Sequence, residues 1–117
     1  METDQSSPVD VVVTVGADNK PVCTPDTVMA RGRNVVLMFA VQTAGYVFPA
    51  TGAVVVTNPG SQFPQPSRTI GPNDSRATLL DLNTDAGTYK YTVAVQRVAG
   101  GEVLHLDPII KNGNQML

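Results

Sequence analysis

The chain has 117 residues, of which 15% are charged, and its formal net charge is −2. That length falls within the usual size of one domain, and it suffices to bury a core without disulfides or a metal. The eight lysine and arginine residues are scattered rather than clustered, which excludes the basic patch expected of a nucleic-acid or anionic-membrane partner.

The first eight residues are polar, end in proline and show no periodicity. They predict a flexible tail over residues 1–8, ahead of a single domain over 9–112 and a C-terminal tail over 113–117. No basic start is followed by an apolar stretch, and no apolar run approaches the roughly 20 residues that span a bilayer. The sequence as written therefore predicts a cytoplasmic protein without a membrane partner, or a periplasmic or secreted one if a signal has been removed.

Apolar, β-branched segments recur between turn signals along the rest of the chain, and such residues favour strands. The predicted strands cover residues 9–15, 27–30, 34–42, 53–57, 77–82, 88–98 and 102–110. Glycine, proline and asparagine separate them, and no window of helical period with capping residues interrupts them. About seven short strands predict an all-β protein, a single Greek-key β-sandwich.

Two of these strands indicate where the core lies. The strand over 34–42 is apolar on both faces, as expected of a central strand, or of one whose outer face meets a partner or a loop. The strand over 88–98 alternates, and its predicted inward face carries Tyr89, Tyr91, Val93 and Val95. Tyr89 also follows Asp85 and Gly87 at the spacing of a tyrosine corner, in which the phenol hydroxyl bonds backbone near the start of the strand.

Two segments resemble parts of a known sandwich family. Residues 25–36 look like a strand, a glycine turn and a second strand, and residues 87–93 look like the strand that bears a cysteine ligand in that family. Through these segments, and through its strand pattern over roughly 9–110, the chain resembles the cupredoxins, copper-binding Greek-key sandwiches related to plastocyanin. The resemblance implies a cupredoxin-like shell.

The copper ligands of that family are missing from this chain. A blue-copper site needs a thiolate and two imidazoles. Here the thiolate position is Val93, and the loop after the strand has no histidine. The one histidine, His105, lies on the last predicted strand. The resemblance therefore implies a copper-free scaffold, and we expect no cofactor.

An immunoglobulin-like sandwich explains the same residues. The spacing of Asp85, Gly87 and Tyr89 fits its tyrosine corner, and Tyr91 stands at the position of its second half-cystine. The chain has neither the disulfide nor the tryptophan of an antibody-type domain. Both topologies stay open, and the ending over residues 105–112 resembles that of small uncharacterised bacterial proteins of cupredoxin shape.

No residue pattern predicts catalysis or metal binding. His105 has Asp107 two residues away, but no nucleophile is marked for it to activate. The single cysteine, Cys23, is interpreted as a small apolar residue packed under a loop. Three aspartates match no calcium loop and are interpreted as solvated turn carboxylates, namely Asp74, Asp81 and Asp85. We therefore expect no enzyme, with no catalytic and no metal-binding residues.

These exclusions favour a non-catalytic binding or protein-interaction module, whose partner is an unknown protein or small ligand. Loops on a rigid sandwich commonly carry binding, and aromatic residues are enriched at interfaces. Tyr46, Phe48 and Phe63 lie in the segments 45–48 and 62–66, where they form either an exposed contact surface or a closure for one end of the sandwich. An edge strand that pairs with a second copy, giving a homo-oligomer, is a related prediction.

The alternative from another class is a metal-handling or redox protein. It would use Cys23 and His105 in a non-standard site, which requires that folding bring the sulfur and the imidazole together. A separation too large for a shared ion would exclude this function.

Overall fold

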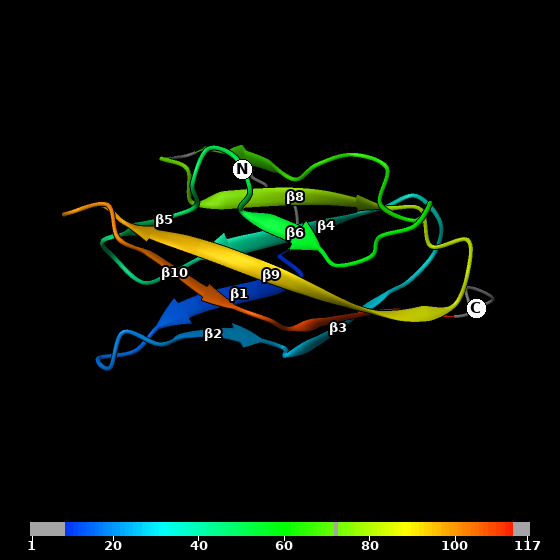
Figure 1. The fold of residues 1–117 in the computed structure, drawn as a ribbon, viewed down its shortest axis with the longest axis horizontal. Helices are drawn as coiled ribbons and strands as arrows, with labels where there is room; N and C mark the ends of the chain where they lie inside the picture. Colours follow the sequence, from blue (N-terminus) through cyan, green and yellow to red (C-terminus); the bar gives the residue numbers. More distant parts are fainter. Residues whose placement is uncertain (1–8, 72, 114–117) are drawn as a thin grey trace, which may run out of the picture.

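The computed structural model describes residues 9–71 and 73–113. Over these residues the chain forms eleven strands and no helix, and the strands make two sheets packed face to face (Figure 1). The all-β sandwich predicted from the strand pattern is confirmed. The predicted tail over 1–8, residues 114–117 of the C-terminal one, and Pro72 lie outside the described residues.

The first sheet has the strand order β2-β1-β4-β8-β7. Its members are β1 (Val11–Val15), β2 (Pro21–Thr24), β4 (Val35–Val41), β7 (Arg68–Ile70) and β8 (Arg76–Asp81). β1 pairs in parallel with β4, and the other neighbours are antiparallel. The apolar strand predicted over 34–42 is therefore central, with two strands on each side.

The second sheet is built around the long strand β9 (Gly87–Arg97), which crosses the sandwich in Figure 1. One edge of β9 pairs with β10 (Val103–Leu106) and then with β11 (Ile109–Asn112). The opposite edge pairs with β5 (Tyr46–Val47) and β6 (Val54–Val56). β3 (Thr27–Ala30) completes the sheet, parallel to β11, so the chain changes sheets between β2 and β3.

The last predicted strand is divided in the structure. The segment over 102–110 becomes β10 and β11, separated at Pro108, because a proline nitrogen has no hydrogen to donate to a ladder. The Pro108 carbonyl still accepts the Tyr91 N–H at 3.1 Å, which keeps both strands on the same edge of β9. The sequence pattern does not indicate β2, β5 or β7, each of which has four residues or fewer.

The core lies between the inner faces of the two sheets. Tyr91, Val93 and Val95 of β9 are all 0% exposed, so the predicted inward face of this strand is confirmed. The Tyr91 ring meets Phe39 of β4 edge-on, with 5.6 Å between the ring centroids. Burying a large apolar side chain such as Phe39 stabilises the fold by about 1.5–3 kcal/mol, and this ring contact joins the two sheets across the core.

Candidate functional site

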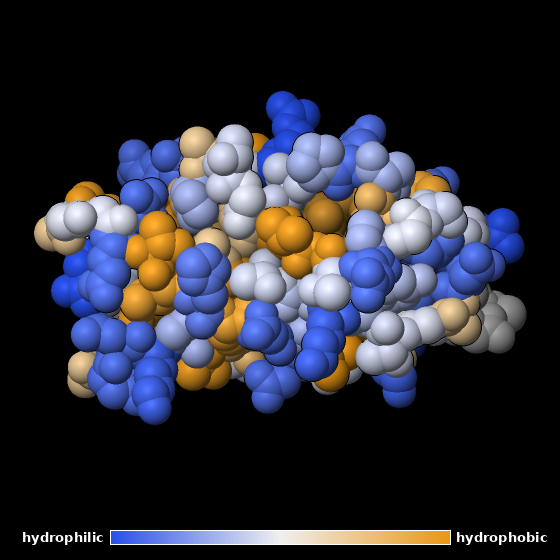
Figure 2. Space-filling view, in the orientation of Figure 1, coloured by the Kyte–Doolittle hydropathy of each residue, from blue (hydrophilic) through white to orange (hydrophobic). Residues whose placement is uncertain are grey.

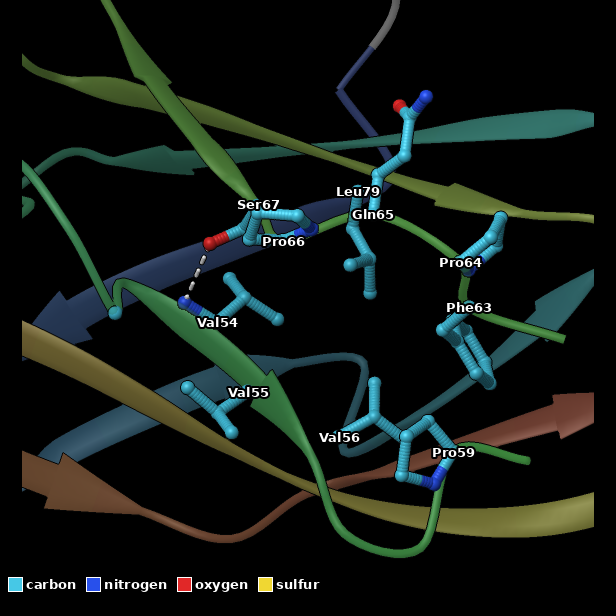
Figure 3. A pocket seen from close by; sticks show the side chains of 11 residues that line it. Val54, Val55, Val56, Pro59, Phe63, Pro64, Gln65, Pro66, Ser67 and Leu79 are labelled. Carbon is cyan, nitrogen blue, oxygen red and sulfur yellow. Dashed lines mark hydrogen bonds between the residues drawn. The ribbon is translucent and has the colours of Figure 1, made fainter. Parts of the chain in front are cut away.

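A pocket of about 230 Å³ opens beside β6, at the side of the sandwich where the two sheets separate (Figure 3). Ten of its eleven lining residues lie between Gly52 and Ser67, and Leu79 of β8 supplies the other. The segment from β6 to β7 thus forms a ring around the pocket, and the first sheet closes its base. We call this cavity the β6 pocket.

Local sequence explains why this ring holds its shape. Three of the lining residues are prolines, which fix the backbone φ angle: Pro59, Pro64 and Pro66. The turn at its start uses the left-handed conformation of Asn58 (φ 51°) and Gly60 (φ 56°), and the Gln62 N–H closes it on the Pro59 carbonyl at 3.2 Å. Its two ends are joined where the Val54 N–H donates to Ser67 Oγ at 3.1 Å (Figure 3). The pocket is therefore preformed, as ligand sites commonly are.

The inner surface of the β6 pocket is apolar. Four of its side chains belong to the core and are less than 10% exposed: Val54, Val56, Phe63 and Leu79. Gln65 and Ser67 are its only polar lining residues, and none of the eleven is titratable. Figure 2 shows hydrophobic surface over β6 in the middle of this face, where Val55 is 53% exposed.

The backbone of β6 is paired on one edge only, since within the described residues this strand pairs with β9 alone. The Ala53 carbonyl accepts the Ala94 N–H at 2.8 Å, and the Thr57 N–H donates to the Lys90 carbonyl at 2.9 Å. Because the two directions alternate along an antiparallel strand, the backbone groups of Val54 and Val56 point away from β9. They lie on the side of the pocket, where Ser67 already takes the Val54 N–H.

Of the two arrangements that the sequence allowed for Tyr46, Phe48 and Phe63, the exposed aromatic surface is not formed. Phe48 is 1% exposed and Phe63 is 7% exposed, so both rings belong to the core, the other arrangement that the sequence allowed. Phe63 contacts the Tyr89 ring edge-on at 5.0 Å between centroids, and it turns one side to the β6 pocket. A proline-rich loop folds such a ring inward because burying it is favourable by about 1.5–3 kcal/mol.

Tyr46 lies at the other end of β9. Its ring is half-buried beneath the guanidinium of Arg97, whose Cζ is 5.6 Å from the ring centroid. The Arg97 Nη2 donates to the Tyr46 hydroxyl at 3.1 Å and to Asn19 Oδ1 at 2.6 Å. At roughly 3.3 Å per residue, the eight steps from Tyr89 to Arg97 separate Tyr46 from Phe63 by about 26 Å along the strand. The three aromatics do not make one surface.

A tyrosine corner was predicted at Tyr89, and the structure gives the position of its ring. The ring folds back over Gly87, where an added Cβ would lie 3.3 Å from Cε1 of Tyr89. A side chain at position 87 would therefore push against the tyrosine. The hydrogen bond from the phenol to backbone stays a prediction.

Cys23 and His105 point in different directions. Cys23 is 2% exposed on the inner face of β2, and burial, with a smaller contribution from Asp26, raises the pKa of its thiol to about 12. His105 is exposed on β10, opposite Ala94. In the described part of the chain, no three His, Cys, Asp or Glu residues gather as metal ligands. The structure thus gives Cys23 the packing role that the sequence indicated, and a site shared by Cys23 and His105 stays a prediction.

A second group of residues, missed by the sequence reasoning, lies where β3, β8 and β11 end. Four polar side chains are at most 3% exposed there: Gln62, Asp81, Asn83 and Asn112. We call them the buried polar cluster. Asp81 is 0% exposed, so its interpretation as a solvated turn carboxylate is wrong, and burial raises the pKa of its carboxyl. The two-residue alternation of β8 could have predicted this burial, because Asp81 lies on the same face of the strand as Ala77 and Leu79, which are buried.

Gln62 links this cluster to the β6 pocket. Its Oε1 accepts the Thr84 N–H at 2.9 Å, the Asp85 N–H at 3.2 Å and the Asn112 side-chain amide at 3.2 Å. Its backbone carbonyl accepts the Leu82 N–H at 2.8 Å. The next residue, Phe63, lines the pocket, so this network anchors one side of the ring.

Comparisons with known proteins do not assign the chain to a family. No protein-family model matches the chain, and no curated protein matches it in sequence. Over the residues that the structure describes, no helix has the length and apolar character needed to cross a membrane.

Proposed function

We propose that the protein is a non-catalytic binding module on a copper-free, cupredoxin-like scaffold, and that the β6 pocket receives an apolar group of its partner. The observation that carries this proposal is the preformed, apolar lining of the pocket. No lining residue is titratable, so no side chain in the pocket is available for general acid or base catalysis. An apolar cavity of this kind gains binding free energy mainly from the apolar surface removed from water.

The size of the pocket favours one side chain of a partner over a whole small molecule. Its volume of about 230 Å³ is below the roughly 300–1,000 Å³ typical of small-molecule sites. The unpaired edge of β6 runs beside it, and exposed strand edges bind extended peptides through main-chain hydrogen bonds while pockets take alternate side chains. We therefore propose an extended protein segment with one large aliphatic residue as the partner.

The choice of scaffold rests on the strand pairings. β1 pairs in parallel with β4, and β3 in parallel with β11. Both sheets of the constant-type immunoglobulin sandwich are antiparallel, so these two pairs support the cupredoxin-like alternative. Val93, at the thiolate position of the cupredoxin strand, is 0% exposed and serves the core.

The test has two steps: peptides that bind the protein are selected, and their affinity is then measured for a variant whose pocket is filled by a larger side chain. Random heptapeptides displayed on phage are selected on the immobilised wild-type protein, and the enriched ones are measured by calorimetry. We expect them to share one large aliphatic residue, and we expect Val56→Phe, which places a larger side chain in the pocket, to raise Kd at least tenfold, or about 1.4 kcal/mol.

Val98→Phe is the matched control. It makes the same change at a valine that is 65% exposed and outside the pocket, and its Kd should equal that of the wild type. Urea unfolding verifies that both variants are folded. Equal affinity of the two variants, or no enriched peptide at all, would contradict the proposal.

A second copy of the chain is the other partner that the β6 edge favours, because an unpaired strand edge also accepts the same strand of another molecule. Sedimentation over a concentration series separates the two partners. Monomer at every concentration would remove the homo-oligomer and leave the peptide.

A further inference from the structure

The buried polar cluster contains more hydrogen-bond acceptors than donors. The amide nitrogen of Asn83 donates to the carbonyls of Ala30 at 3.2 Å and Gly32 at 2.6 Å. The amide of Asn112 donates to Gln62 Oε1 at 3.2 Å, and it acts on the nearby Asp81 carboxyl, where it favours the charged form. Because both NH₂ groups face acceptors, the orientation of each amide is set, and each Oδ1 is a carbonyl oxygen.

Three oxygens of the cluster have no donor. Asp81 Oδ2, Asn83 Oδ1 and Asn112 Oδ1 are buried without a hydrogen-bond partner among the described residues. The other carboxylate oxygen, Asp81 Oδ1, accepts the Asn83 N–H at 3.0 Å. Leaving buried acceptors unpaired is costly, and here all the unpaired side-chain atoms are acceptors.

Asp81 is a buried carboxyl, and no basic side chain of the described residues is among the groups that act on it. The groups that act on this carboxyl, besides its burial, are the Asn112 amide and the Asn83 N–H. A buried carboxyl either takes up a proton, which its burial favours, or keeps its charge because it is paired or coordinates a metal. Carboxylate and amide oxygens are the ligands that hard cations prefer.

We propose that a small hard cation binds the buried polar cluster, with Asp81, Asn83 and Asn112 as its side-chain ligands. The single negative charge of Asp81 favours a monovalent ion, Na⁺, over Ca²⁺, which takes the same oxygen ligands. The ion joins the end of β8 to the end of β11. The proposal does not rest on the binding function proposed for the β6 pocket, although Gln62 connects the cluster to the loop that lines that pocket.

Stability measurements with exchanged cations test the proposal. Urea unfolding of the wild type is followed at constant ionic strength, with tetramethylammonium chloride replaced stepwise by NaCl, and in a separate arm with CaCl₂. A ligand that binds only the folded state at ten times its Kd raises the folding equilibrium constant about elevenfold. We expect that increase with Na⁺; an increase with Ca²⁺ alone would support the site and identify the ion as divalent.

Asp81→Asn should abolish the cation dependence, since it removes the charge and keeps the shape. Asp74→Asn, the same change at an exposed carboxylate, should leave it intact. The ²³Na NMR linewidth of the folded wild type gives a direct readout that does not require either variant to fold. If neither cation stabilises the wild type and the ²³Na signal is not broadened, the proposal is overturned, and the three oxygens are left to water or to a proton on Asp81.

Discussion

The β6 pocket and the buried polar cluster meet at Gln62 and Phe63, yet one is lined by apolar side chains and the other is built from buried polar ones. The pocket is apolar inside, and beside it runs the edge of β6 that pairs with no other strand of the described residues. The cluster holds four polar side chains at 3% exposure or less. An apolar surface open to solvent can gain free energy from a partner, whereas a buried polar network mainly specifies one arrangement of the chain. The β6 pocket is thus the region proposed to bind, and the buried polar cluster is the region that holds its loop in place.

The largest expected difference between the two regions is in the free energy of unfolding, when Gln62 of the cluster and Gln65 of the pocket rim are each replaced by leucine. Gln62→Leu leaves the Thr84 and Asp85 N–H groups and the Asn112 amide without their shared acceptor. The Thr84 and Asp85 bonds are only partly buried, so at the lower end of about 1–3 kcal/mol for each group the three losses should lower the free energy of unfolding by about 3 kcal/mol.

Gln65→Leu is the matched control, three residues further on at the exposed rim of the pocket. Its free energy of unfolding should stay within about 0.5 kcal/mol of the wild type. Urea unfolding measures both variants. Equal losses in the two would mean that Gln62 does not anchor the ring.

A pH series on Cys23, which belongs to neither region, gives the next largest effect. The pKa of the folded thiol is about 12, above its model-compound value of 9.0, so the unfolded chain loses this proton first. This contribution to stability is constant below pH 9 and falls as pH rises from 9 towards 12, by about 1.4 kcal/mol per unit.

The difference in unfolding free energy between the wild type and Cys23→Ala isolates that slope from other groups. We expect it to be flat from pH 7 to about 8 and to have fallen by about 1.4 kcal/mol at pH 10. A difference that is already changing near pH 7 would indicate a reactive thiol of low pKa and would favour the redox alternative.

The strand pattern predicted most of the fold, because valine-rich alternation carries over directly to pleated sheets. Pro108 marks the limit of this prediction. A proline in the sequence indicates a break in the strand, but only the pairings with β9 show that β10 and β11 lie on the same edge. β7, a three-residue strand, depends on its partner β8 and has little signal of its own.

The sites were harder to predict, because each depends on residues far apart in the chain. Leu79 and Val54 line the same pocket from different sheets. For Phe63 the sequence left an exposed surface and a closure of the sandwich both open, and its contact with the Tyr89 ring, far along the chain, decides for the buried position. Asp81 was assigned to a turn by residue type, although the alternation of its strand places it inside.

The most direct test of the central claim is to map the bound peptide by NMR. The peptide selected on the wild type is titrated into ¹⁵N-labelled protein, and amide shifts are followed along the chain. We predict the largest changes at Val54–Val56 and at residues 63–67, with none at the Tyr46 and Arg97 end of β9. Shifts confined to that end, or to the outer face around His105, would contradict the assignment of the β6 pocket as the binding site.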